Sequence, residues 1–126
     1  MKKIFLIGVF LLLGATQGFA LSGENAVILI YQDAIESGNI ASVKQIVANA
    51  NIPDPINGQI FPDKKTALII SAENGQVEIL KYFLKKGADP TIVDANNKTA
   101  RAYAEANGNK KIIRKLKRAE KHLIKE

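Results

Sequence analysis

A repeat with a period of 33 residues is the feature of this sequence that most constrains its fold. Residues 66–75 read TALIISAENG and residues 99–108 read TARAYAEANG, so the opening Thr-Ala and the closing Asn-Gly recur at one constant offset. A period of about 20–50 residues is typical of stacked repeats, in which each unit buries its apolar face against its neighbours. We therefore expect an elongated, all-helical array of similar units.

Residues 1–20 have the composition of a secretory signal. Lys2 and Lys3 precede an apolar run over residues 4–13, and Gly18 and Ala20 place small residues at the positions that a signal peptidase reads. We expect cleavage after Ala20, which leaves residues 21–126 as one domain in the periplasm or outside a bacterial cell. The alternative is a retained signal anchor, although the apolar run is shorter than the ~20 residues that a membrane span needs.

Residues 21–126 divide into three units of about the repeat length. We place repeat 1 at about residues 25–57, repeat 2 at about 62–94 and repeat 3 at about 95–126. Apolar residues at helical spacing predict two helices in each unit, at about 25–37 and 40–49 in repeat 1. A glycine follows the first helix of every unit, where a left-handed backbone costs it little: Gly38, Gly75 and Gly108.

Local signals support these helix boundaries. Thr66 and Thr99 each precede a predicted helix, where a hydroxyl can accept a hydrogen bond from a free backbone N–H group. Asn97 stands in the turn before Thr99, and asparagine tolerates a left-handed backbone better than most residues. We therefore expect short turns between the units.

The repeat resembles the ankyrin family. The resemblance rests on four motifs of the repeat. They are residues 94–99 (DANNKT) as the opening, 66–75 as the first helix, 77–84 (VEILKYFL) as the second helix and 87–89 (GAD) as the closing turn. Ile69 and its equivalent Ala102 stand where the family prefers histidine, and Ala67 and Ala100 where it prefers proline. The resemblance covers roughly residues 25–117 and implies an all-α, ankyrin-like solenoid of about three helix–turn–helix repeats.

The resemblance also implies a binding surface and a class of function. Members of the family bind partner proteins, without catalysis, through the concave face of the first helices and the turns between units. Carried over position by position, the candidate residues are Glu36, Ser37, Asp63, Lys65, Glu73, Asn74, Ala95, Asn96, Lys98, Ala106 and Asn107. Their mixed polar chemistry suits hydrogen bonds and short-range charge pairing with a protein.

The loop over residues 53–62 offers two readings. Three prolines and an Asn-Gly pair forbid a helix there, yet Ile56, Ile60 and Phe61 are large apolar residues. Exposed apolar groups in a loop mark a contact with a partner. Alternatively, Ile60 and Phe61 fold back over the first helix pair and close the end of the stack.

The C-terminal helix is strongly basic. Residues 108–126 hold eight basic and two acidic side chains, whereas residues 21–107 hold eight and ten. One reading is a long capping helix whose outer face meets water. The alternative is an envelope-surface adaptor that docks on anionic lipid through Lys110, Arg114, Lys117, Arg118 and Lys121.

Catalytic chemistry has few candidate groups in this sequence. The chain has one histidine, His122, and no cysteine, and no cluster of His, Asp and Glu has the spacing of metal ligands. No aromatic residue lies between the C-terminal cations to stack on bases, which argues against nucleic acid. We therefore expect no enzyme, no cofactor and no metal ion. With the family resemblance, this favours a monomeric protein-binding module, and the alternative is that repeat 3 pairs with a second copy of the chain.

Overall fold

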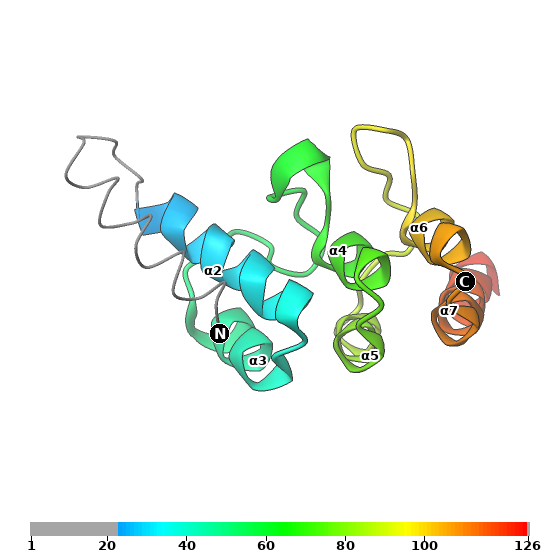
Figure 1. Cartoon of the computed structure of the whole chain (residues 1–126), viewed down its shortest axis with the longest axis horizontal. Helices are drawn as coiled ribbons and strands as arrows, with labels where there is room; N and C mark the ends of the chain where they lie inside the picture. The colour runs from blue at the N-terminus through cyan, green and yellow to red at the C-terminus, as the bar shows by residue number, and fades with distance from the viewer. Residues whose placement is uncertain (1–22, 126) are drawn as a thin grey trace.

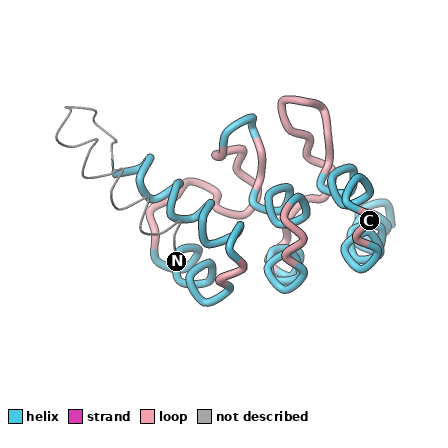
Figure 2. Tube along the Cα trace, viewed as in Figure 1, coloured by secondary structure: helices cyan, strands magenta, loops and turns pink. Residues whose placement is uncertain are grey.

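The computed structural model describes residues 23–125, and within them it is all-helical (Figures 1 and 2). The predicted leader over residues 1–20 lies outside the described residues. The predicted array of three helix pairs is confirmed, as is the absence of strands from the described chain. The elements are α2 (Gly23–Ser37), α3 (Ile40–Asn49), the 3-10 turn η1 (Pro62–Lys64), α4 (Ala67–Glu73), α5 (Val77–Lys85), α6 (Ala100–Asn107) and α7 (Lys110–Lys125).

The helices form two layers. The first helices of the units, α2, α4 and α6, lie side by side in one layer, and α3, α5 and α7 form the other (Figure 1). The first helices pack more closely on one another than the second helices do. Buried alanines explain this difference, because small side chains let α4 and α6 approach: Ala67, Ala72, Ala100 and Ala104. The layer of first helices is therefore the inner, concave side of the array.

One apolar core runs through all three units. Its largest fully buried members come from both layers and include Tyr31, Leu68, Leu80, Phe83, Ile112 and Leu116. Each unit alone would leave one face of these side chains in water, so burial couples the units into one domain.

The helix ends follow the sequence signals. The hydroxyls of Thr66 and Thr99 accept hydrogen bonds of 3.2 Å from the backbone N–H groups of Ile69 and Ala102. Gly38, Gly75 and Gly108 have φ values of 79°, 69° and 69°, a left-handed conformation that favours glycine. These local expectations are confirmed.

The loop over residues 53–62 folds back onto the core. Phe61 is 4% exposed, and its ring centroid lies 5.3 Å from that of Tyr31 in α2. The Tyr31 hydroxyl in turn donates a 2.7 Å hydrogen bond to the carbonyl oxygen of Pro55. Ile56 and Ile60 are half-buried against the same core. The loop therefore covers α2 with its apolar side chains.

Two polar side chains tie this loop to the next unit. Asn57 accepts a 2.8 Å hydrogen bond from the N–H of Asp89 and donates one of 3.3 Å to the carbonyl of Gly87. The Gln59 amide donates to the carbonyl of Val93 at 2.8 Å. These bonds hold the loop against the turn that closes repeat 2.

Helix α7 caps the stack. Its residues Ile112 and Leu116 are fully buried, whereas Lys110 and Lys117 are exposed. Arg101 of α6 is partly exposed and forms ion pairs with Glu105 at 3.4 Å and with Glu120 of α7 at 3.3 Å. Within residues 23–125, every helix is too short or too polar to cross a membrane.

Candidate functional site

The predicted inner-face residues lie at the ends of the first helices. Glu36 and Ser37 end α2, Glu73 ends α4 with Asn74 directly after it, and Ala106 and Asn107 end α6. Because α2, α4 and α6 lie side by side (Figure 1), these three pairs form one row across the concave side. The side-chain amide of Asn107 donates a 2.8 Å hydrogen bond to the carbonyl of Glu73 and joins two neighbouring units.

The predicted loop residues lie on two loops that project from the same side of the array (Figure 2). Asp63 and Lys65 belong to the loop around η1, and the other three lie between Asp94 and Thr99: Ala95, Asn96 and Lys98. The N–H of Ala95 donates a 2.8 Å hydrogen bond to the carbonyl of Asp63. The two loops are therefore connected at their tips.

A cluster around Tyr103 connects the loops to the helix ends. The Nζ atom of Lys65 lies 2.9 Å from each carboxylate oxygen of Glu73 and 5.2 Å from the ring centroid of Tyr103. The Nζ atom of Lys98 lies 5.6 Å from the same centroid. The Tyr103 hydroxyl donates a hydrogen bond to Asp94. We call these five residues, Lys65, Glu73, Asp94, Lys98 and Tyr103, the Tyr103 cluster.

Electrostatics within the Tyr103 cluster favour the charged forms of Lys65 and Asp94 and the neutral form of Tyr103. Burial opposes the charge of Lys65, but the hydrogen bond and negative charge of Glu73 outweigh it and raise the pKa of Lys65. Burial alone would raise the pKa of Asp94, yet the hydrogen bonds from Tyr103 and two backbone N–H groups lower it below the usual value. The bond to Asp94 raises the pKa of Tyr103. These directions keep Lys65 a cation, Asp94 a carboxylate and Tyr103 a neutral phenol near neutral pH.

Tyr103 and Asp94 were absent from the predicted site. Their equivalents one repeat earlier are Ile70 and Phe61, which are both buried. The signal that reveals the pair is this exchange of two apolar residues for two polar ones at matching positions. A polar residue that replaces a core residue in one repeat alone indicates a local hydrogen bond.

The predicted loop residues Ile56, Ile60 and Phe61 lie apart from the inner-face row. Phe61 is buried and the two isoleucines are half-buried. Phe61 thus takes the packing role that the sequence left open, and its side chain is not presented to a partner. Whether Ile56 and Ile60 also contact a partner stays a prediction.

The described residues offer surface recognition chemistry. Within residues 23–125, no group of three or more His, Cys, Asp and Glu side chains could hold a metal ion. His122 is exposed on α7. The Tyr103 cluster supplies charged groups and one aromatic face, which suit non-covalent contact with another macromolecule.

Comparison with known proteins identifies the repeat. A family model described as "Ankyrin repeats (3 copies)" matches residues 31–125. The chain is also 25% identical over 83 residues to a protein of Arabidopsis thaliana named "Putative E3 ubiquitin-protein ligase XBAT31". That match covers 66% of this chain and 18% of the relative, so the chain spans less than a fifth of that protein's length. Ankyrin repeats are protein–protein interaction modules, and on this evidence the chain belongs to the ankyrin-repeat family.

Proposed function

We propose that this chain is an exported, non-enzymatic module that binds a partner protein through its inner-face row and the two projecting loops. The observation that carries the proposal is the Tyr103 cluster, which brings residues from two repeats and two loops into one ordered surface. Its ion pair and hydrogen bonds are formed within the chain itself, so they hold the binding groups in place before any partner arrives.

Preorganisation explains how so small an array could bind usefully. Association loses free energy when flexible side chains become ordered, at about 0.5–1.5 kcal/mol for each one. Lys65 is already held by Glu73, and Asn107 by its bond to the carbonyl of Glu73. A partner that meets these groups has less ordering to impose, so more of the contact energy remains as affinity.

Export is the second part of the proposal and rests on residues 1–20, with their paired lysines, apolar run and small residues before Leu21. Fractionation of the native cell tests it. We expect the mature chain, shortened by the leader, in the periplasmic or extracellular fraction. Full-length protein in the cytoplasmic fraction alone would remove this part and leave the binding surface unaffected.

The chain offers a matched pair of variants for the binding test. Ala106 and Asn107 are the last two residues of α6 on the inner face, and Ala48 and Asn49 are the last two residues of α3 in the other layer. All four are exposed. Arginine at both positions of either pair adds the same charge at the same place in a helix.

Photo-crosslinking in the native cell provides the readout, with the crosslinker on the exposed Asn74 of the inner face. We expect the Ala106→Arg/Asn107→Arg variant to lose its crosslinked products and the Ala48→Arg/Asn49→Arg variant to keep them. Equal product patterns from the two variants would show that the inner face is not the binding site.

Anionic lipid remains a second candidate ligand because of one observation. The five predicted lipid-contact residues of α7 are all exposed: Lys110, Arg114, Lys117, Arg118 and Lys121. Co-sedimentation with anionic vesicles at low salt and at ~0.5 M salt tests it, because exposed charges are screened at high salt. Lipid docking predicts sedimentation at low salt alone, and no sedimentation at either salt concentration would exclude it.

A further inference from the structure

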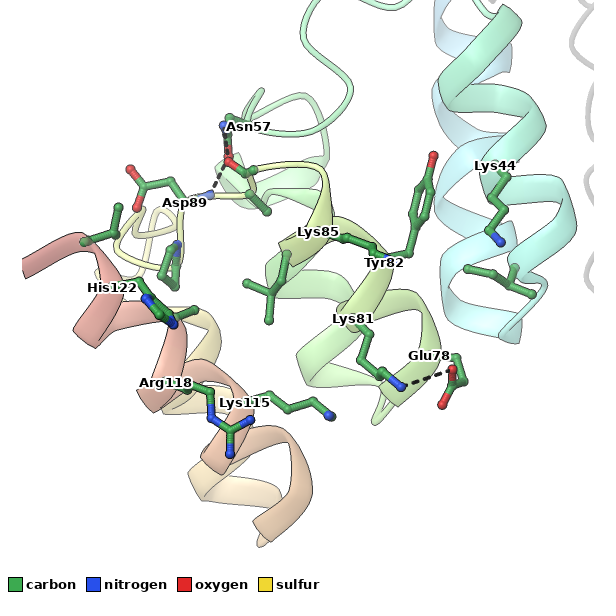
Figure 3. Close-up of a pocket in the computed structure, with 17 residues that line it drawn as sticks. Lys44, Asn57, Glu78, Lys81, Tyr82, Lys85, Asp89, Lys115, Arg118 and His122 are labelled. Carbon is green, nitrogen blue, oxygen red and sulfur yellow. Dashed lines mark hydrogen bonds and ion pairs between the residues drawn. The ribbon is translucent and has the colours of Figure 1, made fainter. Parts of the chain in front are cut away.

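A basic groove lies on the second-helix side of the array, away from the inner-face row. It has a volume of about 1130 Å³ and runs between α5 and α7, with one edge on α3 (Figure 3). The looser packing between second helices leaves this space open. None of the inner-face candidate residues lines it.

The floor of the groove is apolar. It includes Leu84 of α5, Ala88 and Pro90 of the following turn, and Ala119 and Leu123 of α7. Leu123 is 45% exposed although it lies on the apolar side of its helix. Helix α7 has 16 residues and its neighbour α5 has 9, so α5 is too short to cover α7 along its whole length. The apolar arc of α7 is therefore only partly covered.

The walls of the groove carry mostly positive charge. Five cationic side chains line it, against the two carboxylates of Glu78 and Asp89: Lys44, Lys81, Lys85, Lys115 and Arg118. In Figure 3, Lys115 extends from α7 toward α5, which carries Lys81 and Lys85. Like charges therefore face one another across the groove, and an anionic ligand would relieve their repulsion.

The carboxylates near the groove do little to neutralise it. Glu78 meets Lys81 at 3.8 Å in an exposed pair, and Asp89 accepts hydrogen bonds from the backbone and hydroxyl of Thr91. Within residues 23–125, no carboxylate lies within ion-pair distance of Lys85, Lys115 or Arg118. The positive charge of these walls is thus available to a ligand.

We propose that this groove is a second docking site, which binds an acidic amphipathic helix of a partner protein. Apolar side chains on one face of that helix would cover the floor, and glutamates or aspartates along its edges would meet the two basic walls. The 9 residues of α5 set the usable length, so a helix of about ten residues matches the groove. The groove shares no residue with the inner-face row, so an experiment can disprove one of the two binding sites without affecting the other.

The position of the cations favours such a helix over a flat membrane surface. The groove cations stand on opposite walls of a depression, where a narrow ligand reaches both sides. Of the five cations that a flat anionic surface would use, only Arg118 lines the groove. The other four lie outside it: Lys110, Arg114, Lys117 and Lys121. This separation lets one experiment distinguish the two ligands.

The test is fluorescence anisotropy of a labelled helical peptide of about ten residues, with leucines on one face and glutamates on the other. The groove variant is Lys81→Glu/Lys115→Glu. Its matched control is Lys117→Glu/Lys121→Glu, which makes the same charge change on exposed residues outside the groove. A peptide with lysine in place of glutamate controls for apolar binding, and circular dichroism checks that each variant is folded.

We expect the groove variant to bind the acidic peptide at least about 10-fold more weakly, and the control variant to stay within about 3-fold of the wild type. Leu123→Ser should also weaken binding, and Ala106→Arg/Asn107→Arg should not. Should Lys81→Glu/Lys115→Glu fail to fold, the single variant Lys85→Glu, at an exposed position, takes its place with Lys117→Glu as control.

Three results would overturn the proposal. The first is an equal loss of affinity for the acidic peptide in the groove and control variants, which would indicate that the peptide responds to net charge alone. The second is equal affinity for the acidic and the lysine peptide. The third is that the wild-type protein does not bind the acidic peptide. If it then binds anionic vesicles, the cations are assigned to lipid.

Discussion

The Nζ atom of Lys65 lies 2.9 Å from both carboxylate oxygens of Glu73, eight residues later in the chain. This ion pair joins the loop after η1 to the end of α4 and holds the lysine under the ring of Tyr103. It thus connects the projecting loop, the inner-face row and the next repeat through one side chain.

Glu73→Gln should change binding more than stability. Because the Glu73 side chain is 34% exposed, solvent screens the pair, and we expect a decrease of at most about 1 kcal/mol in the free energy of unfolding. The yield of partner crosslinking through the inner face should fall by more than this small loss of stability explains, because Lys65 loses its fixed position. Urea unfolding and crosslinking yield measure the two effects. A decrease of several kcal/mol in the free energy of unfolding with unchanged crosslinking would contradict the assignment of the Lys65–Glu73 pair to the binding surface.

Acid should destabilise the protein through Asp94. The pKa of Asp94 in the folded chain is lowered from its ordinary value of 3.8, so the carboxylate contributes stability at pH values above 3.8. That contribution is lost as the pH falls below 3.8 and through the folded pKa. The Tyr103→Phe variant removes one hydrogen bond that lowers the pKa, so its loss on acidification should be smaller.

Chemical unfolding between pH 6 and pH 2 measures this dependence for both proteins. At neutral pH, Tyr103→Phe should lower the free energy of unfolding by about 1.5–3 kcal/mol, the usual range for a hydrogen bond to a charged group. Identical pH profiles for the two proteins would show that the Tyr103 hydroxyl does not stabilise the ionised form of Asp94.

Phe61→Ala should destabilise the protein strongly. The side chain is 4% exposed and packs on Tyr31, and truncation of a buried phenylalanine costs about 3–5 kcal/mol. Small domains have only about 5–15 kcal/mol in total, so this loss is a large share. Ile56→Ala, at a half-buried position of the same loop, should cost clearly less. Thermal unfolding of both variants decides whether Phe61 supports the fold.

Lys64→Gly should stabilise the protein. Lys64 has a φ of 59°, a left-handed conformation that costs a residue with a side chain roughly 1–2 kcal/mol. Part of the gain is offset by the greater freedom of glycine in the unfolded chain, so we expect a net increase of about 0.5–1 kcal/mol. Lys86→Gly, at a φ of −84°, is the matched control and should destabilise. A loss of stability in Lys64→Gly would show that its side chain contributes more than the backbone strain removes.

Much of the fold follows from the sequence because its signals are local. The caps at Thr66 and Thr99 act within three residues, and the glycines act through their own backbone angles. The apolar side chains at helical spacing then pack the two helices of a unit together, and the period of 33 residues repeats this helix pair along the chain. The predicted helices over 25–37 and 40–49 accordingly agree with α2 and α3 to within two residues at each end.

The functional surfaces depend on distances that no local signal contains. Whether Phe61 faces a partner or Tyr31 is decided by the course of the loop over α2, and the Tyr103 cluster exists because Lys65 and Tyr103 come together from different repeats. The groove arises because the second helices stay farther apart than the first. The sequence by itself therefore determined the repeat and its helix ends, through interactions between residues close in the chain. The tertiary structure alone decided which side chains meet across repeats, because those contacts depend on how closely whole helices pack.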